Sequence, residues 1–298
     1  MILHKRFVLF ILVLIIYGLF ALIIKKFGIK ILGSPFEGWF TPDMGFIWLS
    51  NFNINEVLKE VAKYSFNVLG CWYVQISDKK ITTSSLDSSI YYVEYRSLEI
   101  DLSIDSEDIF NNFHKSAKKR IKQFDNRGAI IKRVPFDREF VDVFYSQITD
   151  VFAKQRLLPN YDIKKIYDMA DALKDNPELV FATQVYDPDG TCIASSIYLG
   201  FNEWCYSLAT ASYRSGQWYL PNEKCRWLGM CYWKDKGATS FDMVGFREYK
   251  MKFSPEVVMR PTVIFTKFKA LLYLKKLAQS LVILYRKARG KFYESTHH

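Results

Sequence analysis

The sequence predicts a mixed α+β fold, because segments with the spacing of amphipathic helices alternate with short apolar runs typical of strands. The chain has 298 residues, 50% of them hydrophobic, which is enough for one large domain or two modest ones. Its formal net charge of +10 predicts attraction to a polyanion, such as a membrane surface, a phosphorylated cofactor or RNA. Charge alone does not distinguish these partners.

The N-terminal segment, residues 1–29, is predicted to anchor the chain in a membrane. Residues 7–24 carry no charge and lie between basic flanks. As a helix this run would be about 27 Å long, close to the thickness of a bilayer core. The basic excess on its C-terminal side predicts a body that faces the cytoplasm. The alternative is a buried hairpin of two apolar strands that turns at KKFG, residues 25–28.

Residues 30–128 are predicted to form an α+β half-domain. Apolar runs predict strands, and NINEVLKEVAKY, residues 53–64, has helical spacing. The loop GSPFEGWFTPD combines turn-forming residues with aromatic ones, so Glu37, Trp39 and Asp43 are candidates for binding a substrate. A turn whose aromatic residues only pack is an equal alternative.

A single helix is predicted over residues 105–126, followed by Gly128. Its second half is very basic, and Lys118 and Lys122 share one stripe that would suit phosphates or anionic lipid. A solvated lysine face explains the same pattern equally well.

Residues 129–266 show the order β, α, α, β, β, β, α, β. The predicted elements are a strand at 129–134, helices at 137–154 and 163–173, strands at 180–186, 191–199 and 204–212, a helix at 221–236 and a strand at 239–246. Pro221 suits the first turn of the last helix, and Gly237 suits its end. A strand, a helix and a parallel strand form a crossover unit.

The closing stretch carries an Asp and a Gly in a strand and then a Tyr-Lys-spacer-Phe pattern: Asp242, Gly245, Tyr249, Lys250 and Phe253. With the element order, this pattern resembles the GNAT-like and FemABX-like N-acyltransferases, although Ser254 stands where that family usually has Gly. The resemblance implies a GNAT-like acyltransferase fold over 129–266, preceded by a shortened GNAT-like half-domain.

The resemblance also implies roles for particular residues. Asp242 would accept a proton or hold the acceptor amine, and Lys250 would donate to an oxyanion or a phosphate. The alternatives are a carboxylate that caps a turn and a surface lysine. His114 is the second candidate for a base, and Glu223 is expected only to favour the helix dipole.

Acyl-CoA is the co-substrate that the resemblance implies, with its pyrophosphate at the start of the helix at Pro221. The residues expected to bind it are Arg214, Gly216, Trp218 and Asn222. Trp218 stands where the family pattern has a second small residue, which is a departure from it. Transfer between an activated donor and an amine needs no covalent nucleophile, and the chain contains no G-x-S-x-G motif. Its five cysteines form no CxxC pair, so no metal site is predicted.

The C-terminal segment, residues 267–298, is predicted to be a basic amphipathic helix. Its apolar stripe consists of Ala270, Leu274, Leu277, Leu281, Leu284 and Ala288. Such a helix favours the interface of an anionic membrane, and the alternative is that it packs across the domain.

Three hypotheses follow from the sequence. The first is a membrane-associated N-acyltransferase that transfers an acyl group from acyl-CoA to a small-molecule amine of a cell-envelope or saccharide precursor. The second is a FemABX-like peptidyl transferase that uses aminoacyl-tRNA; it ranks lower because residues 163–176 contain no long helical-hairpin insertion. The third is a catalytically silent protein that binds a polyanion or another partner. No feature indicates a DNA partner.

Overall fold

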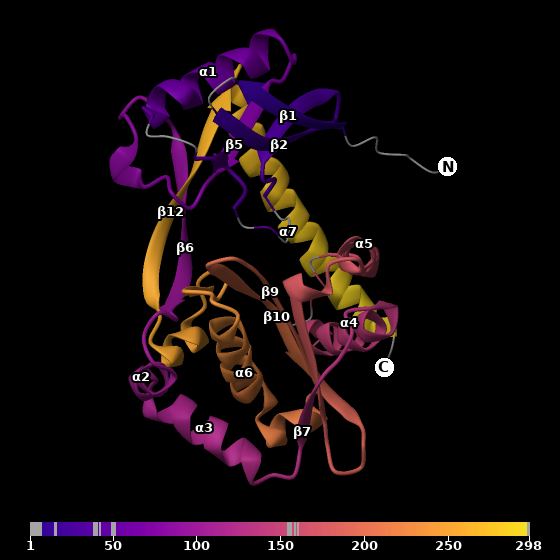
Figure 1. The fold of residues 1–298 in the computed structure, drawn as a ribbon. Helices are drawn as coiled ribbons and strands as arrows, with labels where there is room; N and C mark the ends of the chain where they lie inside the picture. Colours follow the sequence, from indigo (N-terminus) through magenta and orange to yellow (C-terminus); the bar gives the residue numbers. More distant parts are fainter. Residues whose placement is uncertain are drawn as a thin grey trace. The chain divides into compact units, whose positions relative to one another are not determined.

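The computed structural model describes residues 8–14, 17–37, 41, 43–48, 52–153, 157, 159 and 161–296. The chain forms two compact units (Figure 1). Unit 1 combines the N-terminal part of the chain, up to Ser97, with Val258–Ser280. Unit 2 combines Leu98–Val257 with the chain from Leu281 onward. This division differs from the predicted boundaries at 128 and 266, because a strand after residue 256 returns to the sheet of unit 1.

Unit 1 contains a sheet with the strand order β1-β2-β3-β5-β12. Its strands are β1 (Val8–Leu14), β2 (Tyr17–Lys26), β3 (Ile29–Ser34), β4 (Phe46–Ile47), β5 (Tyr73–Ser77) and β12 (Glu256–Thr266). Strand β3 pairs with β5 in parallel, and the other pairs in this sequence are antiparallel. The helix α1 (Ile54–Asn67) buries Leu58 and Val61 in a core that includes Val74 and Val263.

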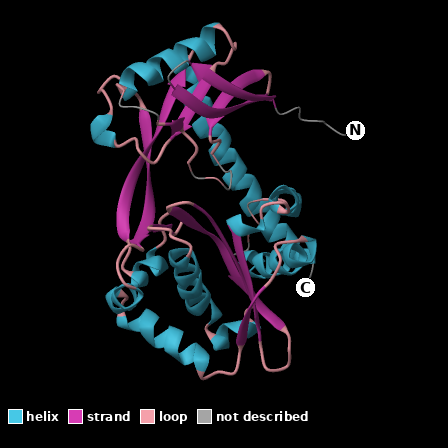
Figure 2. Cartoon of the chain, in the orientation of Figure 1, coloured by secondary structure: helices cyan, strands magenta, loops and turns pink. Residues whose placement is uncertain are grey.

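The membrane-spanning helix predicted over residues 7–24 is wrong, because the described residues of this run form strands (Figure 2). The hairpin alternative holds for β2 and β3, which pair from Leu22↔Gly33 to Lys26↔Ile29. The turn between them uses positive φ at Phe27 and Gly28. No helix in the described part of the chain is long and apolar enough to span a bilayer.

Unit 2 contains the strand order β6-β11-β10-β9-β8-β7. Its strands are the last residues of β6 (Tyr92–Asp101), β7 (Ile130–Arg133), β8 (Val180–Tyr186), β9 (Cys192–Phe201), β10 (Trp204–Ser212) and β11 (Ser240–Asp242). Only β10 and β11 pair in parallel. The predicted order over residues 129–246 is therefore present element by element.

Helices cover both faces of this sheet (Figure 1). Helix α6 (Pro221–Asp235) packs on one face of β9 and β10, while α4 (Arg138–Ala153) packs on the other and contacts α5 (Ile163–Leu173). A Cβ at Gly229 would lie 2.8 Å from the ring of Tyr198, so this glycine lets α6 approach β9 closely. Helix α6 forms the crossover between β10 and β11.

The single helix predicted over residues 105–126 is wrong, because two helices occupy this range. Helix α2 (Ser106–Asn112) ends before the extended residue Phe113, and α3 (Lys115–Asp125) begins after His114. The His114 ring accepts a hydrogen bond from the backbone N–H of Ser116, as an N-cap does. Buried Phe113 packs against Trp227 and Phe253, so the break places an aromatic ring in the core.

Candidate functional site

The candidate site lies where β10 and β11 part. Their parallel pairing covers only Trp204–Tyr206 and Ser240–Asp242, and β10 then continues to Ser212. A bulge between Ser207 and Ala209 marks the start of this divergence. Among the described strands, none pairs with this edge of β10 beyond Tyr206. Backbone N–H groups on such an edge are suited to bind the carbonyl oxygen of a ligand.

The turn after β11 begins at Asp242, which is 1% exposed. Its Oδ1 accepts a hydrogen bond from the backbone N–H of Val244 at 2.7 Å. Val244 has a φ of 53° and Gly245 a φ of 73°. A positive φ is strained for a β-branched residue such as Val244, and strained backbone of this kind clusters at functional sites. The carboxylate of Asp242 therefore stabilises a strained turn at the point where the strands part.

Lys250 holds the same turn from its carbonyl side. Its Nζ donates to the carbonyl oxygens of Met243, Val244 and Gly245 at 2.6, 2.8 and 3.1 Å, so three acceptors match the three N–H bonds of the ammonium. Lys250 is 7% exposed. Burial is the main cause that lowers the pKa of this lysine to about 8; Arg226 and Arg247 lower it further, and Asp242 opposes them. The structure thus brings the two predicted catalytic residues together on one turn.

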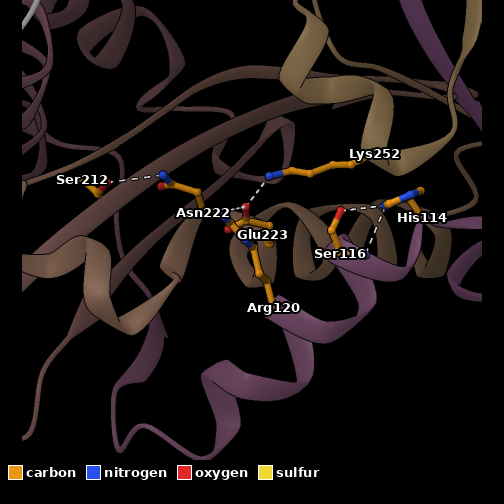
Figure 3. A network of polar contacts seen from close by, with 7 residues as sticks. All are labelled: His114, Ser116, Arg120, Ser212, Asn222, Glu223 and Lys252. Atoms are coloured by element: carbon orange, nitrogen blue, oxygen red, sulfur yellow. Dashed lines mark hydrogen bonds and ion pairs between the residues drawn. The ribbon is translucent and has the colours of Figure 1, made fainter.

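A second polar cluster lies at the start of α6 and contains Glu223, Arg120 and Lys252 (Figure 3). The Glu223 side chain is only 5% exposed, and its Oε1 accepts from Arg120 Nη1 at 3.0 Å and from Lys252 Nζ. Burial raises the pKa of Glu223, but Lys252 and Arg120 outweigh burial and hold this pKa below its usual range. Helix α3, helix α6 and the 3₁₀ helix η4 (Glu248–Phe253) meet at this carboxylate.

Sequence reasoning missed this cluster. Glu223 was expected only to favour the helix dipole, and no local pattern links it to Arg120 or Lys252, which lie 103 and 29 residues away. His114 contributes to the same junction, because its backbone N–H donates to the carbonyl of Lys252 at 2.9 Å. Its ring is engaged with Ser116, 2.8 Å from the hydroxyl oxygen, in the capping role described above.

The four residues predicted to bind the cofactor lie in one segment, from the start of the 3₁₀ helix η3 (Ser215–Tyr219) to the first turn of α6. The backbone N–H of Arg214 donates to Asp150. Gly216 is buried, and a Cβ there would lie 2.6 Å from the Ile193 side chain, so close packing explains this glycine. Trp218 is 62% exposed.

Asn222, the last of these four, lies in the first turn of α6. Its Nδ2 donates to Ser212 Oγ at 3.3 Å, while its buried Oδ1 has no hydrogen-bond partner. The guanidinium of Arg127 lies 4.7 Å from the ring of Trp218, four residues before Asn222 in the chain. The segment therefore combines an exposed aromatic face with a cation stacked on it.

The residues predicted to bind a substrate belong to both units. In unit 1, Glu37 accepts hydrogen bonds from α7 (Ala270–Thr296), and Asp43 accepts from Tyr95 at 2.6 Å. Trp39 lies outside the described residues. In unit 2, Lys118 Nζ donates to the carbonyl of Asn111 at 2.9 Å. Lys122 Nζ lies 5.9 Å from the ring centroid of Phe110.

Comparisons with known proteins bear on the fold of the chain. No family model and no curated protein matches the sequence. Among solved structures, FemX matches with a TM-score of 0.63 and 11% identity, over 87% of this chain and 86% of that one. The chain has a GNAT-like, FemABX-like fold. This FemABX-like fold is shared by L-PGS from Bacillus licheniformis, with a TM-score of 0.57 and 12% identity over 95% of this chain and 90% of that one.

A third match is the C-terminal domain (DUF2156) of a putative lysylphosphatidylglycerol synthetase from Agrobacterium fabrum. Its TM-score is 0.58 at 11% identity, over 92% of this chain and 89% of that one. At these identities the three matches establish the FemABX-like fold. Within the described part of the chain, no group of three or more His, Cys, Asp or Glu side chains is placed to hold a metal ion.

We predict that Glu223→Gln lowers the free energy of unfolding at neutral pH by about 1–3 kcal/mol, because it leaves two cations beside a neutral buried amide. Because Glu223 has a lowered pKa in the folded state, its contribution is complete above pH 4.5, the ordinary pKa, and is lost as pH falls through the folded pKa. Urea unfolding of both chains at pH 7 and pH 3 measures this. Glu60→Gln, in an exposed pair with Lys63, is the control and should change little. An equal loss at both pH values would contradict the prediction.

We also predict a pH dependence for Lys250. Between the folded pKa of about 8 and the unfolded value of 10.5, the unfolded state binds more protons than the folded state. The stability of the natural chain relative to Lys250→Met should therefore rise over this range, by at most about 1.4 kcal/mol per pH unit. Urea unfolding at pH 7.5 and pH 10 measures the difference. The exposed Lys63→Met serves as a control with no such rise, and a pH-independent difference for Lys250→Met would refute the assignment.

Proposed function

We propose that this protein is an acyltransferase that moves an acyl group from an activated donor to an amine. The observation that carries the proposal is the parallel pair β10–β11, which opens after Tyr206 and Asp242 and leaves one edge of β10 without a partner strand among the described residues. In the GNAT enzymes that the chain resembles, the pantetheine arm of acyl-CoA lies between two such strands. The backbone of β10 supplies the donors that bind the carbonyl of the scissile ester or thioester.

The proposed reaction is direct attack by a neutral amine on the carbonyl carbon of the donor. The C–N bond forms, the tetrahedral oxyanion is stabilised by N–H groups on the open edge of β10, and the C–S or C–O bond to the leaving group breaks. The leaving group of a thioester departs as a thiolate, and that of an ester takes up the proton lost by the amine and departs as an alcohol. Asp242 accepts the proton that the amine loses. Its position at the end of β11 supports this role, because β11 forms one side of the opening.

Lys250 has two functions in this proposal. Its three hydrogen bonds hold the Asp242–Gly245 turn, which positions the Asp242 carboxylate. Its ammonium also lies beside that carboxylate, and Asp242 raises the lysine pKa by direct charge interaction. Donation from Lys250 to the oxyanion or a phosphate of the donor would require exchange of one carbonyl partner.

Acyl-CoA is the donor that we propose first. The cluster at the start of α6 contains one carboxylate and two cations, Arg120 and Lys252, so it keeps a net charge of +1 beside a helix N-terminus that favours anions. Trp218 offers an exposed aromatic face close in sequence to this helix start, and Arg127 lies over the ring. A purine base of a phosphorylated donor would stack on this ring, which follows Arg214 by four residues in the chain.

Aminoacyl-tRNA is the second candidate donor. It also ends in an adenosine with phosphates, and the match to FemX, the highest TM-score of the three, favours it. The Agrobacterium protein is described as a putative lysylphosphatidylglycerol synthetase, and this name also favours an aminoacyl donor. We propose that the acceptor is an amine on a cell-envelope or saccharide precursor and that the reaction takes place at the cytoplasmic face of the cell membrane.

Thermal unfolding separates the donors. A ligand that binds only the folded state stabilises it, by about 2.7 kcal/mol when the ligand concentration is about one hundred times its Kd. The melting temperature rises as a result. The expected result is a shift with acetyl-CoA and none with uncharged tRNA. A shift with aminoacyl-tRNA alone would select the second donor. No shift with either would favour a silent protein that binds another partner.

We predict that Asp242→Asn reduces kcat by about 100-fold or more, because the amide cannot accept the proton. The amide oxygen still accepts from Val244 N–H, so the turn and the melting temperature should change little. The measurement is transfer of radiolabelled acetyl from acetyl-CoA, or of a labelled amino acid from its tRNA, to amines of an envelope extract. Asp189→Asn, in an exposed loop, is the matched control. Full transfer by Asp242→Asn would remove this residue from the site.

A further inference from the structure

The C-terminal helix α7 is amphipathic in the reverse of the usual sense. A surface helix normally buries its apolar face and exposes its polar face. In α7 the side-chain hydrogen bonds to the rest of unit 1 come from two polar residues, Lys275 and Gln279. Lys275 Nζ lies 2.8 Å from Glu37 Oε2 and donates to Tyr73 OH, also at 2.8 Å. Gln279 Nε2 donates to Glu37 Oε1 at 2.8 Å.

The apolar side chains of α7 are exposed instead. We call five of them the α7 stripe: Tyr273, Leu274, Leu277, Leu281 and Leu284. Their exposed fractions range from 56% to 74%. At about 100° per residue the stripe is centred roughly 170° around the helix from Lys275 and Gln279. Val282, 56% exposed, lies on the side of Lys275 and Gln279 and is outside the stripe. The stripe runs for about 17 Å along the helix, given a rise of 1.5 Å per residue. A regular row of exposed apolar side chains indicates an interaction surface.

The charge of the same segment indicates which environment that is. Residues 267–296 contain eight Lys or Arg residues and one acidic residue, Glu294. Lys269 and Lys276 are exposed and lie close to the edge of the stripe that Tyr273 marks. A second copy of this helix would bring the same positive charge against itself, whereas an anionic surface would be attracted.

We propose that α7 lies in the interface of an anionic lipid bilayer, with the α7 stripe among the acyl chains and its lysines at the headgroups. Glu37 then has a structural function, because its two hydrogen-bonded partners fix the helix to unit 1 by its polar side. An interfacial helix needs no apolar segment long enough to span the bilayer. The proposal is independent of the donor and of the reaction proposed above.

Vesicle sedimentation with the full purified chain tests the proposal. The probes are vesicles of phosphatidylcholine alone and vesicles that also contain about 30% phosphatidylglycerol, a fraction typical of anionic surfaces. The expected result is binding to the anionic vesicles that weakens as salt rises. Leu277→Glu with Leu281→Glu should weaken binding by at least about tenfold, because two buried leucines are lost from the interface. Lys269→Glu with Lys276→Glu should remove most of the preference for phosphatidylglycerol.

Val68→Glu with Phe201→Glu is the matched control, because these side chains are 63% and 67% exposed and lie outside α7. It adds the same charge and should bind like the natural chain. Circular dichroism checks that each variant folds, and the salt dependence of the natural chain is a test that needs no variant. Equal binding by the stripe variant and the control would overturn the proposal, as would absence of binding by the natural chain. A natural chain that is dimeric without lipid, and monomeric when the stripe is substituted, would assign the stripe to a second copy and also overturn it.

Discussion

The turn from Asp242 to Gly245 is the constraint on which the candidate site depends. It holds Val244 at a positive φ, which a β-branched residue resists. The backbone N–H of Val244 is bound by Asp242, and the carbonyls of the turn are bound by Lys250. Because both side chains are nearly buried, loss of either would leave unsatisfied backbone groups in the interior. The same contacts therefore stabilise the turn and bring a carboxylate and an ammonium group together where β10 and β11 part.

The Glu223 cluster stabilises the other end of the same region, at the start of α6. Helix α6 carries Glu223 in its first turn, α3 contributes Arg120, and η4, which also contains Lys250, contributes Lys252. A buried carboxylate is costly unless it is paired, so these three elements are held together wherever Glu223 is charged. The lysine that holds the turn and the lysine that pairs with Glu223 are two residues apart in η4. The start of α6 and the end of β11 are thereby coupled through one short helix.

The sequence predicted the local elements of unit 2 well, because each has its own periodicity and turn residues. Helix α5 has the predicted ends, and α6 begins at Pro221 as expected. Elements that depend on residues distant in the sequence were harder to predict. Strand β12 was not predicted, and its position depends on β5, as shown by the pairing of Thr262 with Ser77, 185 residues away. The uncharged run from residue 7 to 24 is long enough for a membrane-spanning helix, and this length was the reason for predicting one. The run is also rich in β-branched residues, and its described residues pair with neighbouring strands instead.

The candidate site also depends on contacts between residues that are distant in the sequence. Asp242 and Lys250 could be found from their local motif, but the motif does not reveal that both bind one turn. Arg120 and Lys252 gave no signal, because their importance arises from a carboxylate that only the folded chain brings to them. Glu37 was predicted as a substrate contact from its loop, yet it binds Lys275 and Gln279, more than two hundred residues later in the chain. The sequence of a loop shows which side chains can form hydrogen bonds. The fold determines which partners they bind.

Helix α7 shows why amphipathic pattern and orientation are separate questions. The spacing of its leucines predicted the stripe correctly, but a stripe of this kind usually indicates the buried face of a helix. The carboxylate of Glu37 reverses that expectation, because it binds two polar side chains one helical turn apart and fixes the polar side of α7 to unit 1. The leucines of the stripe lie on the opposite side of the helix and are exposed. The contacts of Glu37 thus show which side of α7 faces unit 1 at Lys275 and Gln279, a point that the spacing of the leucines leaves open.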